Sequence, residues 1–344
     1  MAERVVLHVG TMKSGTSYLQ ALLFAEKPRL AAAGVVVPGT QWADQARAVR
    51  QALAPRGRGS RERWKALVEE VRAAPGSAVV SMEYLGPAHP DTIASVVEAL
   101  GADETRVVVT ARDLNRTLVS MWQETIQNGR TWTWSEYVAD AEARRPGPGP
   151  GAADRRTPGG TFWRQQDLVR IVADWSGVVG GSNVVLATVP RPGAPATTLA
   201  QRFAEATGLD LDTGRAVATA NESLGLASLM VLRRVNEMLN ARDLAFPAGQ
   251  GLRKRLLAKT VLAARRDAEP ALGLVTPPWV REQTQRTVFA LRDSGIRLVG
   301  DWADLEPVDV PGVGPDDVPA AEMHEAALEG IAGLIAEQVA RGRH

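Results

Sequence analysis

Short runs of β-branched and other apolar residues, alternating with helical patterns, constrain the fold of this chain more than any other feature. The runs cover residues 4–9, 78–82 and 106–110, and each has the composition of a strand buried on both faces of a parallel sheet. Apolar residues at helical spacing follow the first run and connect the second run to the third. Strands that alternate with helices form right-handed βαβ units. We therefore predict a three-layer α/β fold with a central parallel sheet flanked by helices.

The remainder of the chain extends this pattern and then becomes mainly helical. Residues 163–175 are predicted to form a helix and residues 183–188 a further strand. Beyond them helical patterns dominate, with one more strand expected at 296–299. We therefore expect an α/β core over residues 1–190 and a mainly helical region, packed on the core, over residues 191–344.

Two segments have distinctive compositions. Residues 144–160 are rich in Pro and Gly and are predicted to form a mobile surface loop, which is either a lid or a linker. Leu252, Leu256, Leu257 and Leu262 share one helical face, opposite a face of Lys and Arg. A basic amphipathic helix of this kind either packs on the surface of the protein or makes peripheral contact with a membrane or an anionic partner.

The composition excludes several classes of protein. Of the 344 residues, 45% are apolar and 23% charged, as in an ordinary globular chain. The chain has no cysteine and four histidines, so the usual ligands of a metal site are lacking and no metal is expected. A net charge of +1 gives no argument for nucleic acid as a partner. The start lacks the pattern of a signal peptide and no run reaches membrane-spanning length, so we expect a cytoplasmic protein.

A glycine-containing loop joins the first predicted strand to the first predicted helix. Its sequence is Gly10-Thr11-Met12-Lys13-Ser14-Gly15-Thr16-Ser17. Backbone N–H groups in such a turn, with the positive end of the helix, form a cradle for phosphate oxygens, to which the hydroxyls of Thr16 and Ser17 can also donate. The two glycines have the spacing of the nucleoside-triphosphate loop, but the Lys that should follow the second glycine is displaced to Lys13. The sequence therefore predicts a phosphate site of P-loop type whose lysine lies inside the loop.

Further polar residues cluster where the third predicted strand meets its helix. Arg112, Arg116 and Ser120 are four residues apart and share one face. The planar fork of an arginine donates two hydrogen bonds at once to a terminal phosphate. A solvated helix face would show the same pattern, so the phosphate interpretation and the structural one both stay open.

Glu83 follows the second predicted strand directly. Because the carboxyl ends of parallel strands converge on one crevice, we expect Glu83 near the loop of Lys13. A carboxylate there can remove a proton from a hydroxyl, or it can simply cap a helix or pair with an arginine. His8, inside the first strand, is expected to be a buried or hydrogen-bonded histidine rather than a catalytic one.

These three segments together resemble the sulfotransferases that use 3′-phosphoadenosine 5′-phosphosulfate (PAPS) as sulfuryl donor. Lys13-Ser14-Gly15-Thr16-Ser17 is similar to the family's loop for the 5′-phosphosulfate, and Arg112 followed by Ser120 is similar to its 3′-phosphate motif. In the glycan-sulfating branch a glutamate after a strand is the base, and Glu83 resembles that glutamate. His89, six residues further on, is the weaker candidate for the base.

The resemblance implies transfer of a sulfuryl group from PAPS to a hydroxyl, or less readily an amine, of a glycan, lipid or natural product. Glu83 would be the general base, Lys13 would stabilise the leaving phosphate, and the helical region 191–344 would contribute to the acceptor site. Two alternatives stay open: a P-loop kinase that uses ATP and magnesium, and a non-catalytic nucleotide-binding scaffold.

Overall fold

The computed structural model describes residues 2–55, 59–147, 156–217 and 223–341. They divide into two compact units, which we describe separately. Unit 1 comprises residues 1–113, 164–219 and 282–306, and unit 2 comprises residues 114–163, 220–281 and 307–344. The units are not separated by a single boundary such as the one expected at residue 190. The chain leaves the sheet after its fourth strand, β4, and returns to it twice, to form β5 and β6.

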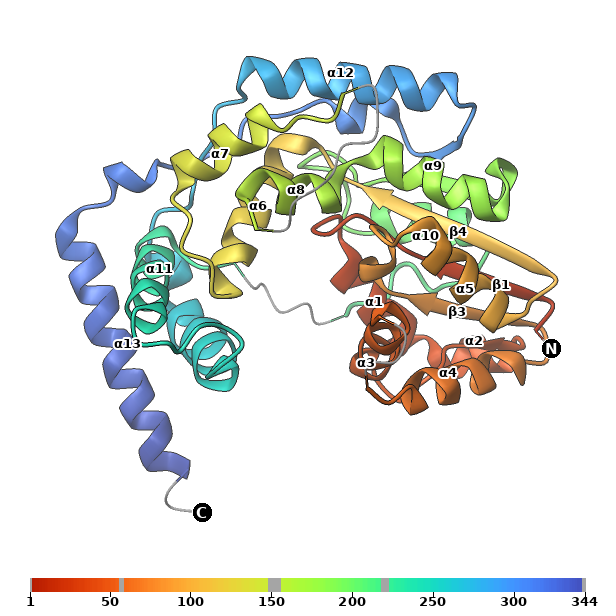
Figure 1. Ribbon diagram of the computed structural model, residues 1–344, viewed down its shortest axis with the longest axis horizontal. Helices are drawn as coiled ribbons and strands as arrows, with labels where there is room; N and C mark the ends of the chain where they lie inside the picture. The colour runs from red at the N-terminus through yellow and green to blue at the C-terminus, as the bar shows by residue number, and fades with distance from the viewer. Residues whose placement is uncertain (1, 56–58, 148–155, 218–222, 342–344) are drawn as a thin grey trace. The chain divides into compact units, whose positions relative to one another are not determined.

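Unit 1 is built on a parallel sheet of six strands in the order β2-β3-β1-β4-β5-β6 (Figure 1). The strands are β1 (Arg4–His8), β2 (Val35–Val36), β3 (Ser77–Ser81), β4 (Glu104–Ala111), β5 (Val184–Thr188) and β6 (Arg297–Val299). β1 is central and pairs in parallel with β3 on one side and β4 on the other. The strands expected at residues 183–188 and 296–299 are both present, as β5 and β6.

Helices of unit 1 cover both faces of this sheet. The helices are α1 (Thr16–Ala25), α2 (Lys27–Ala32), α3 (Trp42–Leu53), α4 (Glu62–Arg72), α5 (Pro90–Leu100), α9 (Leu168–Val179) and α10 (Thr198–Thr207), with short 3₁₀ turns η1 (Glu83–Leu85), η2 (Gly181–Asn183) and η5 (Trp302–Leu305). Alternate residues of β1 point to opposite faces: Val5 and Leu7 pack against α3, α4, α5 and α9, and Val6 packs against α1, α2 and α10. A strand buried on both faces must be apolar throughout, which explains the uninterrupted runs in the sequence. The predicted three-layer α/β fold is confirmed.

The C-terminal half is mainly helical, as expected. Unit 2 contains α6 (Leu114–Gln127), α7 (Trp134–Ala143), α11 (Leu226–Asn240), the π-helical η3 (Gly251–Val261), the 3₁₀ turns η4 (Leu262–Ala268) and η6 (Pro315–Asp317), and α13 (Ala320–Arg341). α8 (Pro158–Gln166) and α12 (Pro278–Asp293) each run from one unit into the other. No helix among the described residues is long and apolar enough to cross a membrane.

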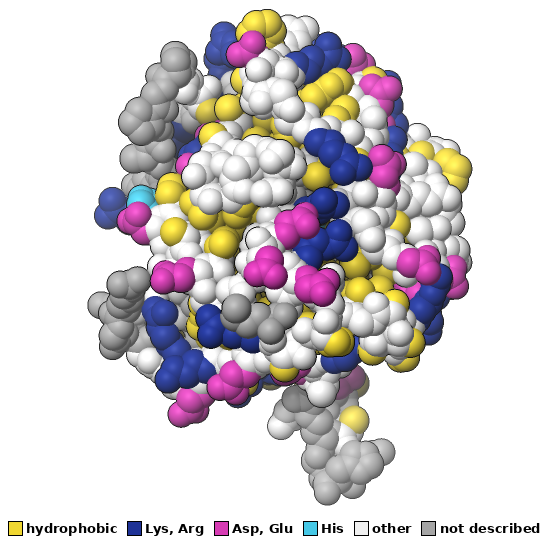
Figure 2. Space-filling model, turned by 90° about the vertical axis from the view of Figure 1, so that its right-hand side faces the viewer, with side chains coloured by type: hydrophobic (Ala, Val, Ile, Leu, Met, Phe, Trp, Pro, Cys, Tyr) yellow, Lys and Arg dark blue, Asp and Glu magenta, His cyan; other side chains and the backbone are white. Residues whose placement is uncertain are grey.

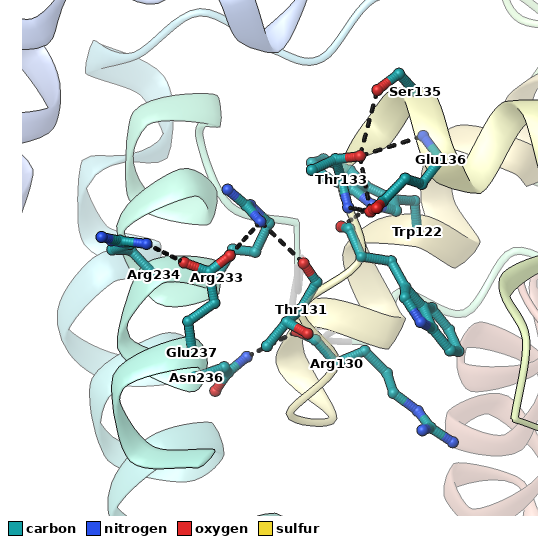
Figure 3. A network of polar contacts seen from close by, with 11 residues as sticks. Trp122, Arg130, Thr131, Thr133, Ser135, Glu136, Arg233, Arg234, Asn236 and Glu237 are labelled. Carbon is teal, nitrogen blue, oxygen red and sulfur yellow. Dashed lines mark hydrogen bonds and ion pairs between the residues drawn. The ribbon is translucent and has the colours of Figure 1, made fainter. Parts of the chain in front are cut away.

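The loop between α6 and α7 is held by side chains of unit 2 (Figure 3). The buried amide of Asn236 donates to the carbonyl oxygens of Ile126, at 2.8 Å, and Arg130, at 3.1 Å. Arg233 Nη1 donates to the carbonyl oxygen of Thr131 at 2.9 Å. Because backbone oxygens of this turn meet buried or ion-paired donors, its conformation is set by α11 as well as by its own sequence.

Two local expectations are corrected by the structure. The helix expected over residues 163–175 is two helices, because Asp167 lies between α8 and α9 and its carboxylate accepts the backbone N–H of Arg170 as an N-cap. The loop expected at residues 144–160 is shorter at its end, since α8 begins at Pro158. Residues 148–155 of that loop lie outside the described residues.

Charged side chains of both signs are interspersed over the described part of the face seen in Figure 2. This distribution agrees with the formal net charge of +1.

Candidate functional site

The predicted phosphate loop lies between β1 and α1, at the carboxyl end of the central strand of unit 1. A Cβ at Gly10 would lie 2.5 Å from Thr110 Oγ1 and 2.9 Å from Thr16 Cγ2, so only glycine fits there. Gly15 has φ of 80° and Lys13 has φ of 66°. The left-handed region costs a residue with a side chain about 1–2 kcal/mol. Strain of this kind persists where the surroundings impose it, and it is concentrated at functional sites.

Three successive carbonyl oxygens of the loop accept hydrogen bonds from side chains. Ser14 Oγ donates to Thr11 O at 2.6 Å, Gln166 Nε2 to Met12 O at 2.9 Å and Arg112 Nη1 to Lys13 O at 3.4 Å. The structure thus places Arg112 at the loop of Lys13, because it follows β4, which pairs in parallel with β1. Gln166, from the end of α8, was missed, and no motif around it could have indicated its role.

A buried chain of hydrogen bonds ties the loop to the sheet. His8 Nδ1 lies 2.7 Å from Ser81 Oγ, His8 Nε2 lies 3.0 Å from Thr110 Oγ1, and Thr110 Oγ1 lies 2.7 Å from Ser14 Oγ. The Ser14 hydroxyl gives its one proton to the carbonyl of Thr11, so it must accept from Thr110.

This proton count fixes the tautomer of His8. The Thr110 hydroxyl has one proton, which it donates to Ser14, so it must accept from His8 Nε2–H. Nδ1 therefore carries no proton and accepts from the Ser81 hydroxyl. Complete burial lowers the pKa of His8 from 6.5 to about 3, which keeps the ring neutral near pH 7. The expectation of a buried, hydrogen-bonded His8 is confirmed.

Glu83 lies in the same unit, at the start of η1 after the end of β3. Gln20 Nε2, on α1, donates to Glu83 Oε2 at 2.8 Å. Glu83 is thus held beside the helix that begins at the loop. His89, the weaker candidate for the base, is instead the exposed N-cap of α5 and accepts the backbone N–H of Asp91.

The other predicted residues differ in their surroundings. Thr16 is buried and Ser17 is exposed at the first turn of α1. Ser120 lies in unit 2, on α6, where its Oγ donates to the carbonyl oxygen of Arg116 at 2.9 Å. Among the described residues, no group of three or more His, Asp or Glu is placed to hold a metal ion.

Comparison with known proteins gives one distant structural likeness. No protein-family model matches the sequence, and a search of curated proteins found no match. A crystal structure of a sulfotransferase from Alicyclobacillus acidocaldarius is similar to this chain with a TM-score of 0.42 and 14% sequence identity, over 73% of this chain and 99% of that one.

Proposed function

We propose that this protein is a sulfotransferase that transfers a sulfuryl group from PAPS to the hydroxyl of an acceptor. The observation that carries the proposal is the loop with Lys13 in the left-handed region and three successive carbonyl oxygens engaged by Ser14, Gln166 and Arg112. The loop leads directly into α1, whose N-terminus carries the positive end of the helix dipole and so favours an anion at this turn.

Each site residue has a role in this reaction. The loop amides and Lys13 would bind the 5′-phosphosulfate, with the hydroxyls of Thr16 and Ser17 near the start of the helix. Arg112 and Ser120 would hold the 3′-phosphate, which distinguishes PAPS from ATP. We leave the acceptor as a glycan, lipid or natural product, with the helical C-terminal region contributing to its binding.

The transfer itself is an in-line displacement. Glu83 takes the proton of the acceptor hydroxyl while the acceptor oxygen forms a bond to sulfur. The bond from sulfur to the bridging oxygen breaks, and its electron pair stays on the leaving 5′-phosphate. The ammonium group of Lys13 and the loop amides stabilise the charge that develops there. Positioning and electrostatics therefore supply the catalysis, and the residues named require no metal.

Binding of the desulfated product, 3′-phosphoadenosine 5′-phosphate, tests the donor site without knowledge of the acceptor. At 100 times its dissociation constant the product should stabilise the fold by about 2.7 kcal/mol, which a thermal-shift titration detects. Arg112→Ala should remove the shift, whereas the matched control Arg106→Ala, within β4, which Arg112 follows, and paired with Glu104, should keep it.

The other outcomes identify the alternatives. Stabilisation by ATP with magnesium, and not by the 3′-phosphorylated nucleotide, would replace the proposal with a kinase. Binding of 3′-phosphoadenosine 5′-phosphate without turnover of any acceptor in a broad panel would favour the non-catalytic nucleotide-binding scaffold. With an active acceptor in hand, Glu83→Gln should abolish turnover and keep product binding, and full activity of this variant would reject Glu83 as the base.

A further inference from the structure

The side-chain amide of Gln20 connects the loop helix to the end of β3. Gln20 is buried, with 3% of its surface exposed. Its Nε2 donates to Glu83 Oε2 at 2.8 Å and to the carbonyl oxygen of Ser81 at 3.4 Å. An amide nitrogen has two protons, so these two bonds use both of them.

We propose that Gln20 is the positioning residue of the general base, and this inference rests on the sulfotransferase function proposed above. A carboxylate on a single bond can rotate, and a buried donor held at one of its oxygens restricts that rotation. Gln20 lies on the second turn of α1, whose first residue, Thr16, follows the loop directly. One helix therefore carries both the phosphate loop and the group that orients Glu83.

The amide suits this task better than a charged side chain would. Lys or Arg at this position would stabilise the carboxylate strongly and make it a poor base, because a neighbouring opposite charge lowers the pKa of an acid. A second carboxylate would have the opposite effect and favour the protonated form. A neutral donor orients the group with a smaller effect on its proton affinity.

The chain provides a matched control at the same strand end. Gln45 is equally buried, and its Oε1 accepts the backbone N–H of Ser81 at 3.0 Å while its Nε2 donates to the carbonyl oxygen of Pro38 at 3.0 Å. Gln20 and Gln45 thus both support Ser81, and Gln20 also donates to the Glu83 carboxylate. Replacing each by Met removes hydrogen bonds of similar number and burial.

The experiment compares Gln20→Met, Gln20→Glu and Gln45→Met by the pH dependence of kcat/KM and by the affinity for 3′-phosphoadenosine 5′-phosphate. Gln20→Met should lower kcat about ten- to hundredfold, as a misplaced catalytic group does, and leave the affinity for the product unchanged. The acidic limb of the kcat/KM profile of Gln20→Met should move to a pH about one unit higher, since a carboxylate that loses a hydrogen-bond donor keeps its proton to higher pH. Gln20→Glu should move the limb further, and Gln45→Met should leave it in place.

Two results would overturn the inference. Unshifted acidic limbs in both Gln20 variants would show that the amide does not act on the base, and equal shifts in Gln20→Met and Gln45→Met would show a general loosening of the strand end. Failure of the proposed function looks different: Glu83→Gln would then stay active, or the product would not bind the unmodified protein. An inactive Glu83→Gln together with a normal Gln20→Met rejects the positioning role alone.

Discussion

A buried neutral histidine makes the stability of the sheet depend on pH in a way that can be worked out from His8. Its pKa is about 3 in the folded protein, where burial disfavours the charged ring, and 6.5 when exposed. Between these two values the unfolded chain binds a proton that the folded chain does not. Stability is therefore fully present above pH 6.5 and is lost as the pH falls toward 3.

The size of the effect follows from the same two values. Going from pH 7 to pH 5, proton binding to the unfolded state should cost the folded protein about 2 kcal/mol through His8 alone. We propose to measure it as the pH dependence of the free energy of opening at the amides of Val6 and Leu7, by native-state hydrogen exchange corrected for intrinsic rates. These residues lie in the same strand as His8, so they report the sheet and not unit 2.

The comparison with His8→Gln isolates the histidine. Glutamine keeps hydrogen-bonding groups in the strand but does not titrate, so the variant should be less stable at pH 7 and should lack the extra loss of about 2 kcal/mol at pH 5. Carboxylates elsewhere contribute equally to both proteins and cancel. Parallel curves for the two proteins would refute the reasoning, because they would mean that His8 binds protons equally in the folded and the unfolded states.

Two substitutions test other parts of the structure. Gly15→Ala should destabilise unit 1 by about 1–2 kcal/mol in a denaturation experiment and weaken binding of 3′-phosphoadenosine 5′-phosphate, because φ is 80° there and the new Cβ would collide with Leu199. An unchanged affinity of Gly15→Ala for 3′-phosphoadenosine 5′-phosphate would show that the loop is not part of the donor site. Asn236→Ala should speed hydrogen exchange at residues 128–133, since the carbonyl oxygens of Ile126 and Arg130 lose a buried donor at a cost of about 1–3 kcal/mol. Unchanged exchange would show that the turn is held by its own sequence.

Much of the α/β core could be predicted because its signals are local. A strand buried on both faces is recognised from its own residues, and so is the loop that follows β1, because Gly10 and Gly15 mark the turn. The approach of Arg112 to the loop followed from the parallel sheet, which brings the ends of β1 and β4 together. These inferences needed only periodicity and topology.

The partners of the loop could not be predicted, because they come from distant parts of the chain. Gln166 reaches Met12 across 154 residues, and nothing around Gln166 marks it. The apolar face expected over residues 252–262 is only partly present, because Leu256, Leu257 and Leu262 are buried but Leu252 is exposed, and Arg253 of the expected basic face is buried. The segment is π-helical over Gly251–Val261, a conformation that its apolar and basic residues do not indicate.

The polar chain of Ser81, His8, Thr110 and Ser14 is better explained by orientation than by stability. Parallel strands buried on both faces favour Val, Ile and Leu, and replacing both partners of a buried hydrogen bond by apolar groups of similar shape is often neutral or stabilising. Yet β3, β1 and β4 each place one polar residue near the end that meets the loop, and the register pairs His8 with Ser81 directly. An apolar layer would hold the sheet together equally well, but it could not direct the Ser14 hydroxyl toward the carbonyl of Thr11. The polar residues therefore orient the loop, and this is the part of the sheet where an apolar sequence would preserve the fold and disturb the proposed anion site.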